Sequence, residues 1–112
     1  MSPPSTLVVG LGVTGETVAL RRLAAGPVTV VEDRPTEASA ARAARLRAAG
    51  VTVVEAPGAE RLAELVAAAG LVVPSPGVPE SHPVYRLAVS TGVPLLSEIE
   101  LAATEAAALG RT

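Results

Sequence analysis

Three glycines near the start of the chain have a spacing that suits the binding of an anion. Gly10, Gly12 and Gly15 form a G-x-G-x-x-G pattern directly after an apolar run at residues 7–9 and before a segment of helical composition. Glycines in this context permit a tight turn and let backbone amides approach a diphosphate at the positive end of a helix. We expect these three residues to form a phosphate loop. The alternative is that they serve tight packing alone.

A charged group follows the next β-branched run, at residues 28–31. Glu32, Asp33 and Arg34 occupy the position at which Rossmann-like domains place the residue that reads the nucleoside. Glu32 has nearly the spacing from the glycines that is expected of an acid binding ribose hydroxyls. The alternative is a polar loop in which Asp33 and Pro35 shape a turn.

A third candidate loop, Ser75, Pro76 and Gly77, ends the apolar run at residues 71–73. The prolines around Ser75 fix the loop, and Gly77 offers a bare amide, but a rigid strand exit explains the residues equally well. The only histidine, His82, precedes Pro83 and has no partners at metal-ligand spacing. A role at a helix entry or on the surface is favoured over catalysis.

Strand-like and helix-like segments alternate along the whole chain. Continuous apolar runs suit strands that are covered on both faces, as in a parallel sheet. A glycine, expected to have positive φ, follows each of the first four helical segments, and Ser97 and Glu100 form a capping box for the last helix. The expected strands are 7–9, 28–31, 51–54, 71–73 and 93–96; the expected helices are 15–25, 36–49, 60–69, 83–91 and 98–109; and the expected glycine stops are Gly26, Gly50, Gly70 and Gly92.

This alternation predicts an α/β fold, a Rossmann-like doubly wound five-stranded parallel sheet with helices on both faces. The expected strand order is 3-2-1-4-5, which opens a crevice at the carboxyl ends of strands 1 and 4. We expect a disordered segment at residues 1–6, one domain at residues 7–97, and a C-terminal helix at residues 98–112.

Composition excludes several functions. A formal net charge of −2 gives no electrostatic reason to expect nucleic acid as a partner. The chain has no cysteine, which excludes disulfides and thiol nucleophiles, and no lysine, which excludes a phosphate-binding loop of the GKT type. The longest uncharged and mostly apolar stretch, 65–79, is too short and too broken to span a bilayer. We expect a cytoplasmic domain with no metal site, no catalytic residue and no membrane contact.

The three loops together resemble the N-terminal domain of the Mur ligases. The similarity lies in VVGLGVTG at residues 8–15, SPGVP at 75–79, and GVP at 92–94 followed by SEIEL at 97–101. It extends over nearly the whole chain and is closest to the ligases that add D-glutamate in peptidoglycan synthesis. The combination of these motifs at these distances is far more specific than any one of them.

The resemblance implies that the domain binds the UDP part of UDP-N-acetylmuramoyl-L-alanine. Val13 and Thr14 would meet the diphosphate through backbone amides and the threonine hydroxyl. The ligand's uracil would be surrounded by Glu32, Asp33 and Arg34, and its other side would be closed by Ser75, Pro76 and Gly77. The family often has Asp then Thr where this chain has Glu32 then Asp33.

For the complete enzyme, the resemblance implies an ATP-dependent ligase that phosphorylates the substrate carboxylate and joins it to D-glutamate. The ATP and Mg²⁺ sites would belong to a central domain and the D-glutamate site mostly to a C-terminal domain, both partners of this one. This domain alone is then expected to hold no cofactor and to be inactive. The main alternative is an NAD-binding Rossmann module of a dehydrogenase or regulatory protein; a structural or interaction domain without a ligand is a third interpretation.

Overall fold

A computed structural model describes residues 5–109 of the chain, and the side chains of residues 5–107. Strands and helices alternate, as the apolar runs predict. The elements in chain order are β1 (Thr6–Val9), α1 (Val13–Arg22), β2 (Val28–Glu32), α2 (Glu37–Ala49), β3 (Thr52–Glu55), α3 (Ala59–Ala68), β4 (Leu71–Pro74), α4 (Pro83–Thr91) and α5 (Glu98–Leu109).

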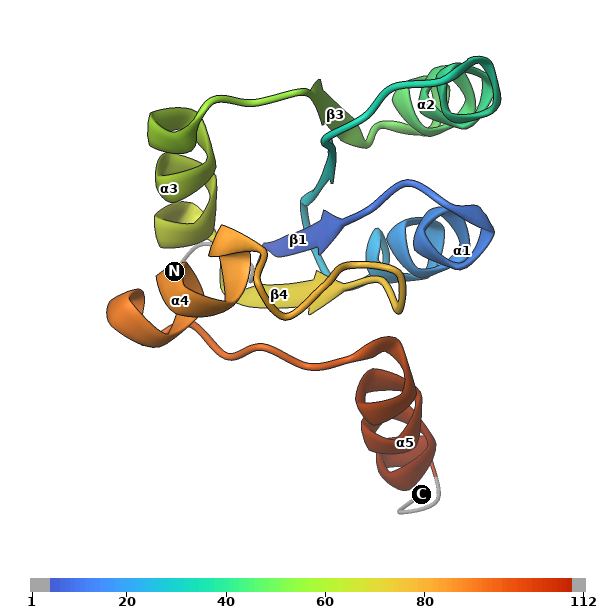
Figure 1. Cartoon of the computed structure of the whole chain (residues 1–112). Helices are drawn as coiled ribbons and strands as arrows, with labels where there is room; N and C mark the ends of the chain where they lie inside the picture. Colours follow the sequence, from blue (N-terminus) through green and yellow to red (C-terminus); the bar gives the residue numbers. More distant parts are fainter. Residues whose placement is uncertain (1–4, 110–112) are drawn as a thin grey trace.

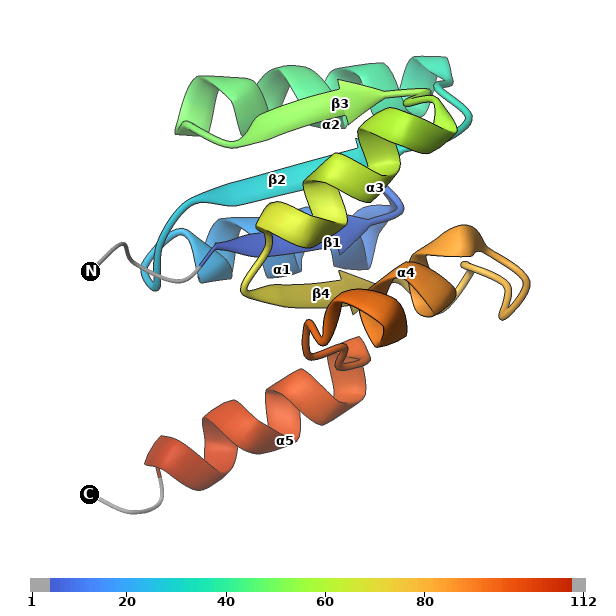
Figure 2. The ribbon, with the colours of Figure 1, turned by 90° about the vertical axis from the view of Figure 1, so that its left-hand side faces the viewer.

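The four strands form one parallel sheet in the order β3-β2-β1-β4, which confirms the predicted order for these strands. β1 lies in the middle, with Val9 opposite Val31 of β2 on one side and Pro74 of β4 on the other. The chain therefore reverses its direction across the sheet between β1 and β4. Figure 2 shows the strands in this order.

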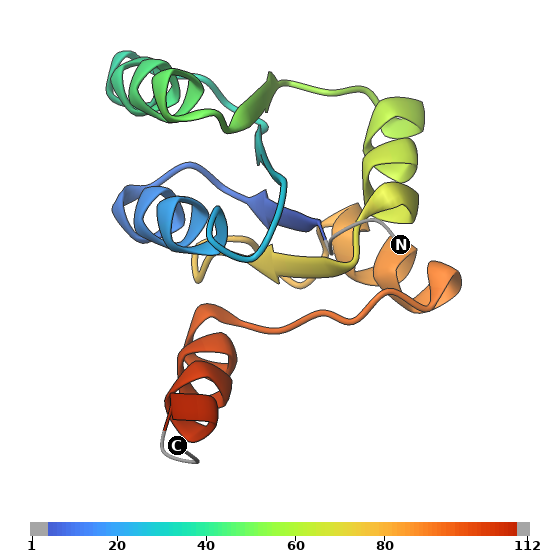
Figure 3. The same cartoon turned by 180° about the vertical axis from the view of Figure 1, so that it is seen from behind.

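Helices cover both faces of the sheet. α1 and α2 lie on one face and α3 and α4 on the other, while α5 lies on the side of α1 beyond β4 (Figures 1 and 3). Because successive side chains of a strand point to opposite faces, Val8 packs into the core below α1 and α2, and Val9 packs below α3 and α4. Both faces of β1, β2 and β4 are largely buried, which explains their continuous apolar runs, whereas the edge strand β3 exposes Thr52 and Glu55.

Two of the four predicted glycine stops end their helices in a left-handed conformation. Gly50 caps α2 with φ 101° and Gly92 caps α4 with φ 74°. Gly26 also has positive φ, at 153°, but follows α1 only after a turn. The expectation of positive φ is wrong for Gly70, because α3 already ends in an extended Ala69 with φ −81° and ψ 147°, so the chain needs no left-handed residue there.

The fifth strand expected at 93–96 is reduced to a single parallel bridge between Leu95 and Val72. The Val72 amide donates to the Pro94 carbonyl at 2.9 Å, and the Leu96 amide donates to the Val72 carbonyl at 3.0 Å. Pairing does not extend further back because Pro94 has no N–H to offer β4. The bridge lies beside β4, where the predicted order puts the fifth strand.

The ordered part of the chain begins earlier than the sequence predicts. Thr6 is already part of β1 and only 2% exposed, so the segment of residues 1–6 predicted to be disordered is too long. Residues 1–4 and 110–112, which complete the expected terminal segments, lie outside the described residues. Within the described part of the chain, no helix has the length and apolar character needed to cross a bilayer.

Candidate functional site

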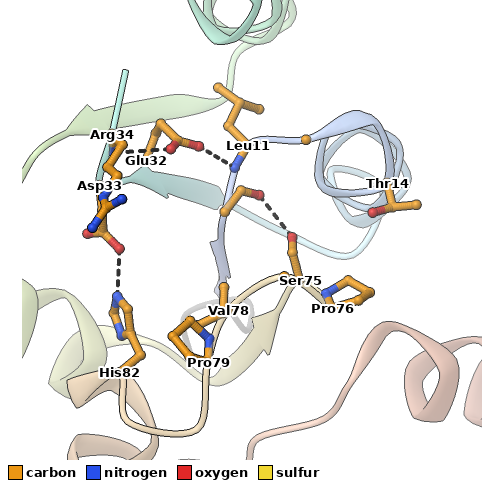
Figure 4. A pocket seen from close by; sticks show the side chains of 13 residues that line it. Leu11, Thr14, Glu32, Asp33, Arg34, Ser75, Pro76, Val78, Pro79 and His82 are labelled. Carbon is orange, nitrogen blue, oxygen red and sulfur yellow. Dashed lines mark hydrogen bonds and ion pairs between the residues drawn. The ribbon is translucent and has the colours of Figure 1, made fainter. Parts of the chain in front are cut away.

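A pocket of about 770 Å³ lies at the carboxyl edge of the sheet (Figure 4). Three segments line it: the glycine turn (residues 10–15) after β1, the acidic loop (residues 32–34) after β2, and the β4–α4 loop (residues 75–82). Strand order explains why they meet, because β2 and β4 flank β1 in the sheet. The lining residues are Gly10, Leu11, Gly12, Thr14, Glu32, Asp33, Arg34, Ser75, Pro76, Gly77, Val78, Pro79 and His82.

Most of the residues that the sequence singled out therefore meet at one pocket. Two do not line it: Val13, whose exposed side chain begins α1, and Gly15, which is buried in the first turn of that helix. The pocket also contains Leu11, Val78 and Pro79, which the sequence reasoning passed over. Their apolar side chains carried no chemical signal, although each adjoins a predicted loop residue.

The three glycines of the turn differ in whether the structure leaves room for a side chain at their position. A Cβ on Gly15 would lie 2.3 Å from the Gly10 carbonyl oxygen, so α1 approaches β1 more closely than any side chain allows. Gly10 has φ +100°, and a Cβ there would stand 3.0 Å from the Cβ of Ser75. Gly12 has ordinary extended angles, and a Cβ there would meet none of the described atoms within 4 Å. Packing accounts for Gly10 and Gly15 but not for Gly12.

The N-terminus of α1 opens on the pocket. Gly12 is its N-cap and provides no side-chain cap, so the first-turn amides of Val13, Thr14 and Gly15 have no acceptor within the helix. Thr14 therefore lies inside the helix and does not cap it. Such a terminus favours negative charge.

The Glu32 carboxylate is engaged with backbone amides around the pocket. Its Oε2 accepts from the Leu11 amide at 2.6 Å and its Oε1 from the Arg34 amide at 3.2 Å (Figure 4). Glu32 thereby joins the acidic loop to the glycine turn. Because the Leu11 amide is already bonded to Glu32, the donors that the turn offers to an anion lie further along it, toward the start of α1.

The β4–α4 loop is attached to the rest of the site by side chains. The Ser75 hydroxyl donates to the Gly10 carbonyl at 3.0 Å and lies 3.3 Å from Oε1 of Glu98 at the start of α5. The Tyr85 hydroxyl donates to the Val78 carbonyl at 3.2 Å. The structure thus gives Ser75 a positioning role in the turn, whichever ligand the pocket takes.

His82 occupies the entry of α4, as the sequence predicts. It is the N-cap, and its Nδ1 accepts from the Val84 amide at 3.1 Å, with Pro83 as the first helical residue. Its Nε2 lies 2.6 Å from Oδ2 of Asp33, a contact between the β4–α4 loop and the acidic loop (Figure 4). Sequence reasoning missed this pair, although the strand order places the two loops on either side of β1.

The start of α5 is capped as predicted. The Ser97 amide donates to the Glu100 carboxylate at 2.9 Å, and the Glu100 amide donates to the Ser97 hydroxyl at 3.1 Å. The hydrogen bond from the Ser97 amide, and then that with the Ser97 side chain, hold the pKa of Glu100 below its ordinary value of 4.5. Glu100 is a cap, whereas the neighbouring Glu98 contacts Ser75 at the edge of the site.

Comparison with known proteins identifies the family. Residues 4–97 match the Mur ligase MurD-like N-terminal domain. The UDP-N-acetylmuramoylalanine–D-glutamate ligase of Desulfatibacillum aliphaticivorans is 40% identical over 97 residues, which are 86% of this chain and 21% of that protein. The ligase of the same name from Streptomyces avermitilis is 41% identical over 97 residues, 85% of this chain and 20% of that protein. The chain thus spans about a fifth of the length of these relatives.

Solved structures agree in fold. The UDP-N-acetylmuramate:L-alanyl-gamma-D-glutamyl-meso-diaminopimelate ligase from Neisseria meningitides superposes with a TM-score of 0.65 at 19% identity, over 87% of this chain and 29% of that one. Shikimate dehydrogenase of Mycobacterium tuberculosis superposes with a TM-score of 0.57 at 21% identity, over 88% of this chain and 47% of that one. At these identities the superpositions show a shared Rossmann-like fold. The sequence match over residues 4–97 is what distinguishes between these proteins, and by it the chain belongs to the MurD-like N-terminal domains of the Mur ligase family.

Proposed function

We propose that this domain binds the UDP part of UDP-N-acetylmuramoyl-L-alanine, as the N-terminal domain of an ATP-dependent ligase that adds D-glutamate in peptidoglycan synthesis. One observation carries the proposal: the glycine turn, the acidic loop and the β4–α4 loop, all within the residues that match the MurD-like domain, line a single pocket at the edge of the sheet. A volume of about 770 Å³ is in the range of small-molecule sites. Its position, where the strand order reverses, is the usual one for nucleotides in open α/β sheets.

The diphosphate would lie against the glycine turn. The amides of Val13 and Thr14 at the start of α1 offer donors at the positive end of the helix dipole. The space beside Gly12 allows the phosphates to approach the backbone. The Thr14 hydroxyl lies on the same wall of the pocket and adds a side-chain donor.

The uracil would lie between the acidic loop and the β4–α4 loop. Asp33 provides an acceptor and Arg34 provides donors there, and Val78 and Pro79 provide apolar contact. Glu32 would act mainly through the turn, because both of its oxygens accept from backbone amides. Ser75, Pro76 and Gly77 would cover the opposite side of the ligand.

The catalytic part of the reaction would lie in other domains of the same ligase. The chain has no lysine, so it lacks the GKT-type phosphate loop for ATP, and within residues 5–107 no three His, Asp or Glu side chains gather in a way that would hold a metal ion. We therefore assign the ATP and Mg²⁺ sites to those other domains. This domain alone should hydrolyse no ATP and form no amide, and the proposed role implies a cytoplasmic location.

Titration of the 112-residue chain with UDP and with NAD, by calorimetry or NMR, tests the proposal. Both ligands offer a diphosphate to the glycine turn, so preference has to come from the base. Loss of a few buried hydrogen bonds typically costs about 1 to 3 kcal/mol, roughly ten- to a hundredfold in affinity. UDP should bind tighter than NAD by a factor of this order. Tighter binding of NAD would favour the dehydrogenase alternative.

A further inference from the structure

The contacts of His82 define which of its ring nitrogens carries the proton. Nδ1 accepts a hydrogen bond from the Val84 amide at 3.1 Å, so Nδ1 carries a lone pair and no hydrogen. In a neutral imidazole the other nitrogen is then the donor. Nε2 therefore carries the hydrogen and donates it to Oδ2 of Asp33 at 2.6 Å. One side chain caps α4 with one nitrogen and holds a carboxylate with the other.

The two partners differ in burial. The His82 side chain is 12% exposed and fixed by the helix it caps, whereas the Asp33 side chain is 43% exposed and belongs to a loop. A fixed donor restricts the rotamers of a mobile acceptor more than the reverse. Asp33 is therefore ordered by His82, with its second oxygen left for another donor.

The contact between His82 and Asp33 also links two of the segments that line the pocket. The β4–α4 loop is attached near its start by Ser75, at its middle by Tyr85, and at its end by His82. Of these three attachments, only the one at His82 reaches the acidic loop. It joins segments 49 residues apart in the chain, on opposite sides of β1.

We propose that His82 is a positioning residue of the nucleotide site: its Nε2–H fixes the Asp33 carboxylate before the ligand arrives, while its Nδ1 serves only the fold. This inference rests on the proposed binding of UDP. Ordering a side chain in advance removes a cost of binding, and for one flexible side chain the effect is about threefold to tenfold in affinity.

Two substitutions separate the roles of the nitrogens. In His82→Asn the side-chain oxygen can replace Nδ1 as the cap, because Asn is among the best N-caps, but nothing reaches Asp33. In His82→Gln the longer amide can place an N–H near the position of Nε2, while the cap is lost. UDP should bind His82→Asn about threefold to tenfold more weakly with little change in Tm. His82→Gln should recover most of that affinity at a lower Tm.

A ligand-free measurement completes the test. The chain has a single histidine, so its ¹⁵N imidazole signals need no assignment to a particular residue. They should report the Nε2–H tautomer, and Asp33→Ala should shift the Nε2 signal. A Nδ1–H tautomer, or an Nε2 signal unmoved by Asp33→Ala, would overturn the proposed contact.

The outcomes also separate this inference from the proposed function. If the wild type binds UDP and His82→Asn binds it equally well, the positioning role is wrong and the function stands. If both His82 variants lose affinity in proportion to their loss of stability, His82 is merely structural. If the wild type binds NAD and not UDP, the proposed function fails, and the same pair of variants titrated with NAD decides the role of His82.

Discussion

The glycine turn and the β4–α4 loop line the pocket side by side and are held in place by different means. The turn depends on missing side chains: Gly15 lets α1 approach the Gly10 carbonyl, where a Cβ would be 2.3 Å away. The loop depends instead on side-chain hydrogen bonds, because Ser75 donates to the Gly10 carbonyl and His82 donates to the Asp33 carboxylate. Substitutions in the turn should therefore act through steric overlap, and those in the loop through single lost hydrogen bonds.

The largest effect is expected for Gly15→Ala. Helix propensity alone predicts a gain of about 1 kcal/mol in stability. The overlap with the Gly10 carbonyl should instead lower the free energy of unfolding by about 3 kcal/mol or more. Urea denaturation measures the change. Gly58→Ala is the control, because a Cβ at that N-cap would meet no atom of the described residues within 4 Å; equal effects of the two would refute the steric account of the turn.

Gly12→Val should change ligand binding more than stability. Gly12 and Gly58 are both N-caps with extended angles and open space where a Cβ would lie, so valine costs both helices a similar amount. Of these two glycines, Gly12 lines the pocket and Gly58 does not. UDP affinity should fall about tenfold or more, about 1.4 kcal/mol, in Gly12→Val and stay unchanged in Gly58→Val. Unchanged UDP binding by folded Gly12→Val would mean that the turn does not hold the diphosphate.

Ser75→Ala should have a moderate effect on stability. It removes the hydrogen bond to the Gly10 carbonyl and leaves that partly buried acceptor without this donor, at a cost of about 1 kcal/mol. Ser90→Ala is the control, because its hydroxyl bonds an exposed carbonyl on its own helix. Thermal unfolding of both variants compares them. If Ser75→Ala is as stable as Ser90→Ala, the hydroxyl does not hold the β4–α4 loop.

The smallest effect is expected for Glu100→Gln, in the first turn of α5. Its hydrogen bonds with Ser97 lower the pKa of Glu100 in the folded state, so the ionised group stabilises the fold above the ordinary value of 4.5, and this contribution is lost as the pH falls through the lowered value. Glutamine can keep the capping geometry without the charge. The wild type should exceed the variant in Tm at neutral pH, and the difference should shrink in acid. A difference independent of pH would contradict the ionic cap.

Sequence reasoning was most successful where one residue type has one physical meaning. The apolar runs predicted the strands and the layers because burial on both faces fixes them, and the strand order followed from the doubly wound topology that the alternation implies. The G-x-G-x-x-G pattern placed the pocket, yet it could not distinguish Gly12, which is open, from Gly15, which is packed. That distinction depends on how closely α1 approaches β1, a distance that no local pattern contains.

The failures have physical causes of the same kind. The expected fifth strand is reduced to one bridge because Pro94 has no N–H with which to extend the pairing toward residue 93; the interpretation of residues 93–96 rested on their apolar character and left this out. The pairing of Asp33 with His82 needs two segments far apart in sequence to meet. Glu32 was interpreted as a ligand residue from its position after the second strand and its spacing from the glycines, and that role stays a prediction; its two amide partners become visible only when the turn is folded.

The single bridge between Leu95 and Val72 has a consequence for slow fluctuations of the molecule. Among the described residues, α5 and the segment leading to it are joined to the body by that bridge, by the hydrogen bond between Ser75 and Glu98, by the packing of Leu96 and Leu101, and by a partly exposed ion pair between Arg21 and Glu105. So few contacts should let α5 separate from the sheet while the strands stay paired, as a partial opening of lower free energy than global unfolding. The Leu96 amide should then exchange with deuterium well before those of the central strand β1.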